Sequence, residues 1–255
     1  MKSWLVIFII FFSTTVFSQG LPRHSGDVAT LIKDAGHFEN NLDEKSALDK
    51  YKEAFKLQPS NVLALNKCSE LCSRIGTRET DDKTRATYYQ NAKNYATAAL
   101  QIKPENAEAN CVMAIALGCI ALNGSSREKV DAARDIKKYL DKAIIQDPMN
   151  FKAWHVLGRW NYEMSGLNIF QRAAVKIIFG GLPPSSLQQS ITAFEKANRI
   201  KTFAANNFEM ARAYKRNGET DKAIAVINSL LELPNQTEDD EDYKNEGRKL
   251  LKQWQ

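Results

Sequence analysis

The 255-residue sequence has only three histidines and none of the short motifs that mark common catalytic or metal centres. No H-E-x-x-H, C-x-x-C or G-x-S-x-G occurs. The pair Gly180-Gly181 is followed by Leu-Pro-Pro, whereas a phosphate-binding loop requires Lys and Ser or Thr. We therefore expect no enzymatic activity, no metal site and no cofactor.

A strong charge of one sign is also missing. Lys and Arg number 35 against 30 Asp and Glu, which gives a net charge of +5. No run of basic residues forms a stripe that could follow a phosphate backbone. Nucleic acid is therefore not an expected partner, whereas a local site for an anion remains open.

Outside the N-terminus, no segment is apolar enough to be expected to cross a bilayer. Lys2 precedes an apolar run from Trp4 to Phe12, and Val16 and Ser18 are the small residues before a cut that would leave Gln19 first. This pattern is typical of a secretory signal peptide, and the run is shorter than the roughly 20 residues of a spanning helix. We predict a signal peptide at 1–18, a linker at 19–26 and export to the periplasm or medium. An uncleaved N-terminal anchor is the alternative.

Cysteine is scarce, and its spacing does not favour disulfides. Cys68 and Cys72 are four residues apart on one expected helix, and Cys111 and Cys119 are eight apart on another. Neither spacing suits a bridge within a helix. We expect four packed thiols, with a bridge between the two helices left open.

The sequence does contain a recurring pattern of small residues, aromatics and proline. Trp154, Leu157 and Gly158 form the W-x₂-L-G that opens a tetratricopeptide repeat. The second half of such a repeat, A-x₃-Y-x₂-A-x₄-P, occurs at Ala47 to Pro59. Variants of this ending recur at 92–104, 136–148, 190–202 and 223–234. Such repetition predicts a stack of helix pairs.

We therefore expect an all-α, tetratricopeptide-like helical-repeat solenoid over residues 27–255. The spacing predicts five helix pairs and a C-terminal capping helix, at 28–61, 62–106, 107–150, 151–203, 204–236 and 237–255. Helix-capping side chains are expected at the start of five of these six units, namely Ser25 to Asp27, Asn61, Asn106, Asn150 and Thr237.

Repeat four carries an insertion of about twenty residues beyond the standard repeat length. An apolar stripe is followed by Gly180 to Pro184, which breaks the helix. We favour a helix that packs into the superhelix and closes part of its groove. The alternative is the wall of an apolar ligand site or a contact with a membrane surface, where Arg172 and Lys176 would meet anionic head groups. The stripe consists of Ile169, Phe170, Ala173, Ala174, Ile177 and Ile178.

The concave wall of such a solenoid is lined by regular positions of the first helix of each pair. In repeats four and five these positions place several cations together, and guanidinium groups suit a carboxylate or phosphate. The alternative is that these cations pair with neighbouring acidic residues. The positions are Lys152, His155, Arg159, Tyr162, Ala205, Phe208, Arg212 and Lys215.

Two segments carry a more specific resemblance. LGRWNYE at Leu157 to Glu163 and GLNIFQRAAVKIIFGGLPPSS at Gly166 to Ser186 resemble the regulator of microtubule dynamics family. The resemblance implies a helical-repeat domain used for binding. Animal members are associated with microtubules and with membrane contacts, and the repeat domain of one member binds and transfers phospholipid. This chain differs in its export signal and lacks a long coiled coil, so we do not expect the microtubule role to carry over.

The expected function is that of a non-enzymatic exported binding protein that engages a protein or peptide through its concave face. The alternative is phospholipid or fatty-acid binding or transfer, through the apolar groove and the inserted helix. The candidate binding residues are Lys152, His155, Arg159, Tyr162, Phe170, Arg172, Lys176, Ile177, Phe208, Arg212 and Lys215.

Overall fold

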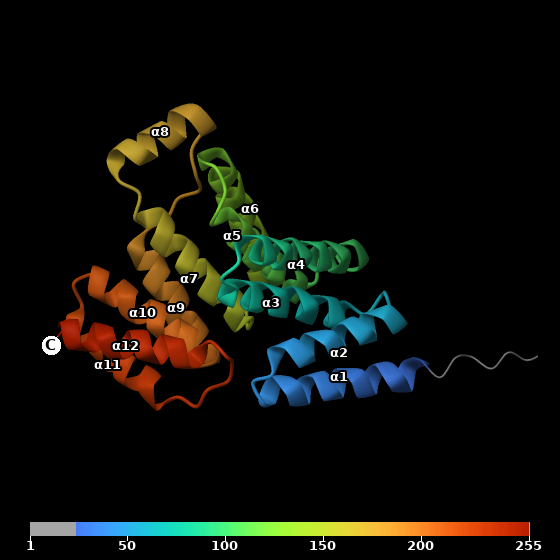
Figure 1. Ribbon diagram of the computed structural model, residues 1–255. Coiled ribbons are helices and arrows are strands. Elements are labelled where there is room, and N and C mark those ends of the chain that lie inside the picture. The colour runs from blue at the N-terminus through green and yellow to red at the C-terminus, as the bar shows by residue number, and fades with distance from the viewer. Residues whose placement is uncertain (1–23, 255) are drawn as a thin grey trace, which may run out of the picture.

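The computed structural model describes residues 24–254, which form twelve α-helices and no strand (Figure 1). The predicted signal peptide lies outside the described residues. The predicted cap at Ser25 to Asp27 is wrong, because α1 already begins at His24. The helices are α1 (His24–Asn40), α2 (Glu44–Leu57), α3 (Val62–Arg78), α4 (Asp82–Ile102), α5 (Ala107–Ala121), α6 (Ser126–Gln146), α7 (Phe151–Ser165), α8 (Ile169–Phe179), α9 (Leu187–Ile200), α10 (Ala204–Arg216), α11 (Thr220–Glu232) and α12 (Asp240–Trp254).

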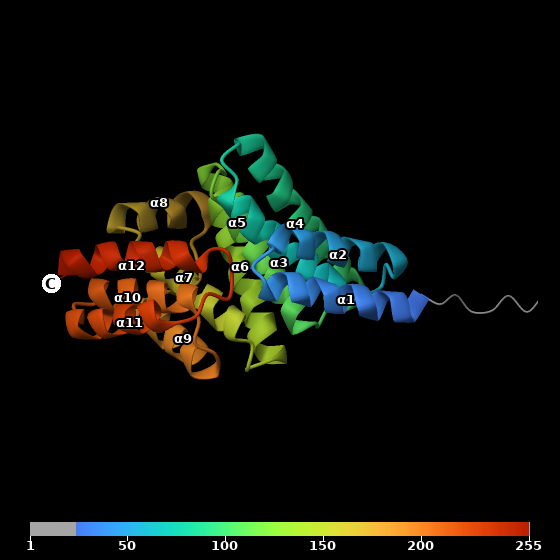
Figure 2. The ribbon, with the colours of Figure 1, turned by 60° about the horizontal axis from the view of Figure 1, so that its bottom comes forward.

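These helices form five stacked pairs, as the repeat spacing predicts. The pairs are α1 with α2, α3 with α4, α5 with α6, α7 with α9 and α10 with α11. The last helix, α12, lies against α10 and α11 (Figure 2). Leu251 and Trp254 of α12 pack on the apolar side chains of the final pair. The chain is therefore an all-α helical-repeat solenoid with a C-terminal capping helix.

Small side chains let the two helices of a pair approach closely. The alanines of the repeated pattern are fully buried, among them Ala47, Ala54, Ala96 and Ala143. Because an alanine adds little bulk beyond the backbone, these positions bring helix axes together and leave the larger side chains to fill the gaps between pairs.

Asparagine side chains cap the first helix of pairs two, three and four. Asn61, Asn106 and Asn150 each accept a hydrogen bond from the backbone N–H three residues later, at 3.0, 2.8 and 2.9 Å. The predicted caps are confirmed there. Thr237 does not cap α12; its hydroxyl donates to Asp240 at 2.6 Å.

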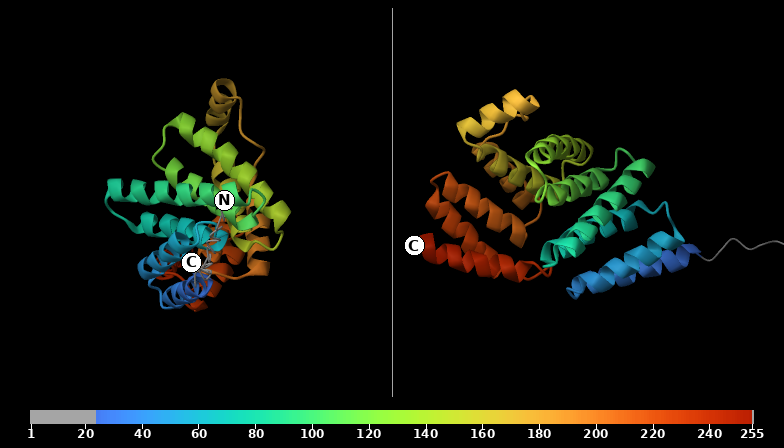
Figure 3. Two further views of the ribbon diagram at one scale, coloured as in Figure 1. Left: turned by 90° about the vertical axis from the view of Figure 1, so that its right-hand side faces the viewer. Right: turned by 45° about the horizontal axis from the view of Figure 1, so that its top comes forward.

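The two ends of the solenoid meet through ion pairs. Arg78 at the end of α3 pairs with Asp239 at 2.8 Å and with Glu238 at 3.2 Å, just before α12. The same guanidinium reaches the buried Glu44 of α2 at 2.8 Å. The backbone N–H of Glu44 donates to Glu238 at 2.8 Å. The segment before α12 therefore lies beside the second helix pair, and the superhelix closes on itself (Figure 3).

The inserted helix α8 stands away from the stack (Figure 1). None of its side chains is buried, so the favoured prediction that it packs into the superhelix is wrong. The physical reason is that α7 and α9 pair directly with each other, and the backbone φ of Gly180 and Gly181 is positive, at 78° and 91°. The chain therefore leaves α7, forms α8 outside the stack and returns through Gly180 to Ser186.

All four cysteines are free, and Cys68, Cys72 and Cys111 are buried. Burial raises the pKa of Cys68 to about 12 and that of Cys72 to about 11. These side chains therefore stay protonated and pack as small hydrophobes, as the sequence predicts.

Candidate binding site

Lys152 is a structural ion-pair partner rather than a free cation on the inner wall. Its ammonium lies 2.9 Å from the carboxylate of Glu70 on α3 and also pairs with Glu108 on α5. Burial lowers the pKa of Lys152, but these two carboxylates outweigh burial and raise it above its usual value. Lys152 therefore joins helix pairs two, three and four and is not available to a ligand as an isolated charge.

The His155 side chain packs among residues of α9 and α10 and does not face the concave surface as a free side chain. Its Nδ1 lies 3.2 Å from Asn206 Oδ1, and its ring meets those of Phe194 and Phe203 at 5.7 and 5.2 Å between centroids. Burial, and to a smaller extent the nearby Arg159 guanidinium, lowers the pKa of His155 to about 3. The imidazole is therefore neutral near pH 7 and packs between helix pairs four and five.

Arg159 and Arg212 converge on a single carboxylate. Arg159 Nε lies 3.6 Å from Glu209 Oε1, and Arg212 donates to Glu209 Oε2 at 2.9 Å. The Arg212 guanidinium also lies 5.2 Å from the Tyr162 ring and 5.8 Å from the Phe208 ring. We call these five residues the Arg159 cluster. Two guanidinium groups share one negative charge, so the cluster carries excess positive charge and unused donors.

Both arginines of the cluster remain accessible. The side chains of Arg159 and Arg212 are 52% and 37% exposed, whereas that of Glu209 is 10% exposed. The aromatic rings fix the Arg212 plane, and a fixed guanidinium loses less conformational entropy when it binds a planar anion. The predicted pairing of these arginines with a neighbouring acidic residue is therefore present but incomplete.

Two residues next to the Arg159 cluster were not among the residues predicted from the sequence. Arg216 lies 4.8 Å from the Tyr162 ring and donates to the Tyr162 carbonyl at 2.8 Å. Tyr243 of α12 meets Phe208 at 5.5 Å between ring centroids. Neither occupies a concave-wall position of the repeat, so only the packing of α10 against α7 and α12 brings them here. Lys215 instead donates to Thr220 and lies over the Trp254 ring.

The remaining predicted residues lie on or beside α8, away from the Arg159 cluster. Arg172 donates to three backbone carbonyls at and just beyond the end of α7, those of Met164, Leu167 and Ser165, at 3.2, 3.0 and 3.0 Å. Phe170 and Ile177 are exposed on α8. The sequence-predicted residues therefore do not line one groove: Arg159, Tyr162, Phe208 and Arg212 belong to the Arg159 cluster, and the residues of α8 lie apart from them.

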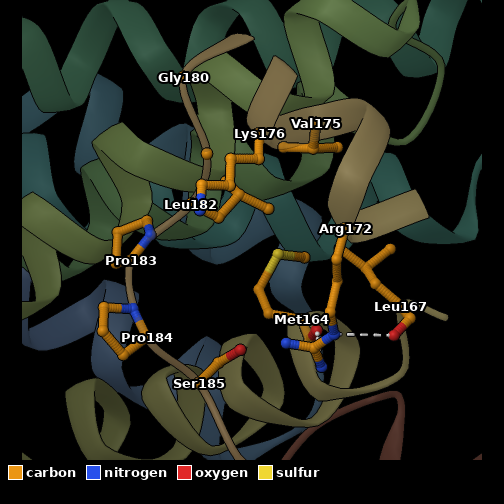
Figure 4. A pocket seen from close by; sticks show the side chains of 11 residues that line it. Met164, Leu167, Arg172, Val175, Lys176, Gly180, Leu182, Pro183, Pro184 and Ser185 are labelled. Carbon is orange, nitrogen blue, oxygen red and sulfur yellow. Dashed lines mark hydrogen bonds between the residues drawn. The ribbon is translucent and has the colours of Figure 1, made fainter. Parts of the chain in front are cut away.

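A cavity of about 300 Å³ opens beneath α8 (Figure 4). The Lys176 ammonium makes no hydrogen bond or ion pair with any described residue. Apolar side chains and one exposed cation are the surroundings that an amphipathic anion requires. The lining consists of Met164, Leu167, Arg172, Val175, Lys176 and the loop Gly180 to Ser185.

Residues 24–254 contain neither a candidate metal site nor a candidate membrane-spanning helix. No group of three or more His, Cys, Asp or Glu residues could hold a metal ion there. No helix in this part of the chain is long and apolar enough to cross a membrane.

Comparison with solved structures shows the same repeat fold. A thermophilic tetratricopeptide-repeat protein from Thermus thermophilus superposes with a TM-score of 0.63 at 14% identity, over 88% of this chain and 98% of that chain. The PilF protein of Pseudomonas aeruginosa gives a TM-score of 0.52 at 14% identity, over 90% of this chain and 92% of that chain. At this identity the likeness establishes the fold alone.

Sequence comparison adds the family. Regulator of microtubule dynamics protein 3 of Rattus norvegicus is 23% identical over 233 residues, 88% of this chain and 48% of the relative. Regulator of microtubule dynamics protein 1 of Caenorhabditis elegans is 22% identical over 71% of this chain and 80% of the relative. The chain spans about half the length of the first relatives it matches. A model described as Regulator of microtubule dynamics protein 1-3 matches residues 31–255, and the chain therefore belongs to the regulator of microtubule dynamics family.

Proposed function

We propose that the chain is a non-enzymatic, exported binding protein that engages an acidic segment of a protein partner at the Arg159 cluster. One observation carries the proposal: Arg159 and Arg212 share the single carboxylate of Glu209 and both remain accessible. Export rests on the signal-peptide pattern at 1–18. The relatives' name concerns microtubule dynamics, but this chain spans about half of several of them. We therefore take only the binding role from the family.

The chemistry of the cluster favours a carboxylate-bearing partner. A peptide carboxylate can take two parallel hydrogen bonds from a guanidinium, which an ammonium cannot supply. Tyr162 and Phe208 hold the Arg212 guanidinium in place before binding. Phe208 and Tyr243 offer an aromatic surface beside the charges, where apolar side chains of the same peptide can pack.

Fluorescence anisotropy with a labelled glutamate-rich peptide tests the proposal, with a lysine-rich peptide as the negative probe. The Arg159→Ala/Arg212→Ala variant should bind the acidic peptide at least about tenfold more weakly, because each charge-assisted hydrogen bond contributes about 1.5–3 kcal/mol. The matched control removes two exposed arginines elsewhere, Arg127 and Arg248. Equal losses in both double variants would show a general charge effect and would contradict the proposal.

A second candidate function is the binding of a fatty acid or phospholipid in the cavity beneath α8. The observation that favours it is the Lys176 ammonium, which has no partner among residues 24–254 and lies beside Met164, Leu167 and Leu182. Native mass spectrometry of the purified protein, followed by lipid extraction, tests this candidate. Absence of co-purifying lipid, together with no uptake from liposomes, would reject it.

A further inference from the structure

One helix exposes a continuous apolar face. Phe170 and Ile177 are 81% and 84% exposed, and Ile169 and Ile178 are 75% and 67% exposed. With Ala173 and Ala174 these residues recur at helical spacing and occupy about half of the helix circumference. We call these six residues the α8 face. Large exposed apolar patches of this kind mark interaction sites.

The helix is held in this position without burying its apolar face. Asn168 and Gln171 form a capping box at its start, and Gly180 ends it in the left-handed conformation. Arg172 ties its first turn to the end of α7. Arg134 of α6 donates to the Gly181 carbonyl at 3.0 Å and also to that of Phe179. The exposed face is thus a preformed surface on an anchored helix.

The segment that carries the α8 face contains charges of one sign only. From Met164 to Phe194 the sequence contains two cations, Arg172 and Lys176, and no acidic residue. Both cations belong to α8, and Lys176 borders the face beside Ile169. An amphipathic helix with basic residues and large apolar side chains is the type that lies in the interface of an anionic bilayer.

We propose that the α8 face docks the protein onto an anionic membrane surface, with Phe170 and Ile177 in the acyl boundary and Lys176 at the lipid phosphates. A second protein copy is a poorer occupant. The helix carries two cations and no acidic residue, so a symmetric contact between two α8 faces would bring like charges together without compensation.

The position of α8 fits a flat partner. It lies at one extremity of the molecule, beyond the ends of α6 and α7 (Figure 3). An interfacial helix sinks only about 5–10 Å into the headgroup region. The remaining helix pairs therefore need not enter the bilayer, and the Arg159 cluster stays free. The proposal is independent of the acidic partner proposed above.

A tryptophan introduced into the α8 face tests the docking in the full chain. Phe170→Trp is compared with Ile145→Trp, because Ile145 is 74% exposed on α6 and serves as the matched control. The vesicles contain phosphatidylcholine alone or with phosphatidylglycerol, with brominated acyl chains as quencher. The emission of the natural tryptophans is subtracted with the parent protein. Comparison of positions 170 and 145 separates insertion of the α8 face from membrane contacts elsewhere in the chain.

With anionic vesicles, the emission from position 170 should shift to the blue and be quenched, whereas position 145 should not respond. Adding Lys176→Glu should raise the lipid concentration for half-quenching about tenfold or more, because it changes the local charge by two. An unchanged spectrum at position 170, equal quenching at position 145, or equal quenching by neutral vesicles would overturn the proposal. A shift that depends on protein concentration without vesicles would also overturn it, in favour of self-association.

Discussion

The ring of Phe194 on α9 lies directly over Gly158 on α7, and a Cβ at position 158 would lie 2.6 Å from it. The Gly158 carbonyl also accepts a hydrogen bond from the Ser190 hydroxyl at 2.8 Å. The two helices of this pair are not consecutive in the sequence, because α8 is inserted between them. The contact therefore joins α7 to α9 across the insertion. Gly158 and Phe194 therefore keep repeat four intact despite its insertion.

Gly158→Ala should lower the free energy of unfolding by about 1–3 kcal/mol, because the added methyl group forces Phe194 out of place. The control is Gly36→Ala in α1, where a Cβ would meet nothing within 4 Å. That substitution should leave stability unchanged or raise it by up to about 1 kcal/mol, since alanine is the better helix former. Urea unfolding measures both values. Equal effects of the two substitutions would show that the close approach does not matter.

Arg78→Ala should open the closed superhelix. The substitution leaves Glu238 and Asp239 without this cation, whereas the buried Glu44 keeps Arg74 at 3.0 Å. We expect a loss of about 1–3 kcal/mol in stability, below the range for an uncompensated buried charge. Hydrogen exchange should rise in the segment before α12. Unchanged protection there would mean that the contact does not hold the two ends together.

His155 should make the protein sensitive to mild acid. Its pKa is about 3 in the folded chain against 6.5 for a free histidine, so only the unfolded chain gains a proton as the pH falls below about 6.5. Stability from this residue is full above that pH and is lost as the pH falls. Between about pH 6.5 and about pH 5 the loss should reach roughly 2 kcal/mol. Urea unfolding of His155→Gln should show a flatter pH dependence; an equally steep one would assign the effect to other groups.

The pair Phe170→Gln/Ile177→Gln should leave stability within about 0.5 kcal/mol of the parent, because both side chains are exposed. Ile191→Gln on α9 is the contrast, since Ile191 is buried and its replacement should cost about 2 kcal/mol or more. Thermal unfolding compares the two variants. A large loss from the α8 pair would mean that the helix packs on the stack in solution.

Local rules predicted much of the fold. Asn61, Asn106 and Asn150 cap helices as expected, because a cap needs only residues within one turn. Lys152 could not be judged this way, since its partner Glu70 lies 82 residues away in the chain and the two meet only through the curvature of the superhelix. The orientation of α8 could not be predicted either. An apolar stripe indicates that another surface covers it, but does not say whether that surface belongs to the same protein. Arg159 and Arg212 were identified from the repeat positions, but Glu209, which decides their charge balance, was not.

Reversing the charge of the Arg159 cluster tests the central claim most directly. The parent protein and Arg159→Glu/Arg212→Glu are each titrated with the glutamate-rich and the lysine-rich peptide, at equal ionic strength. If the cluster recognises an acidic segment, the parent prefers the glutamate-rich peptide and the variant loses or inverts that preference, because specificity is a difference of affinities. Retention of the same preference by the correctly folded variant would contradict the account.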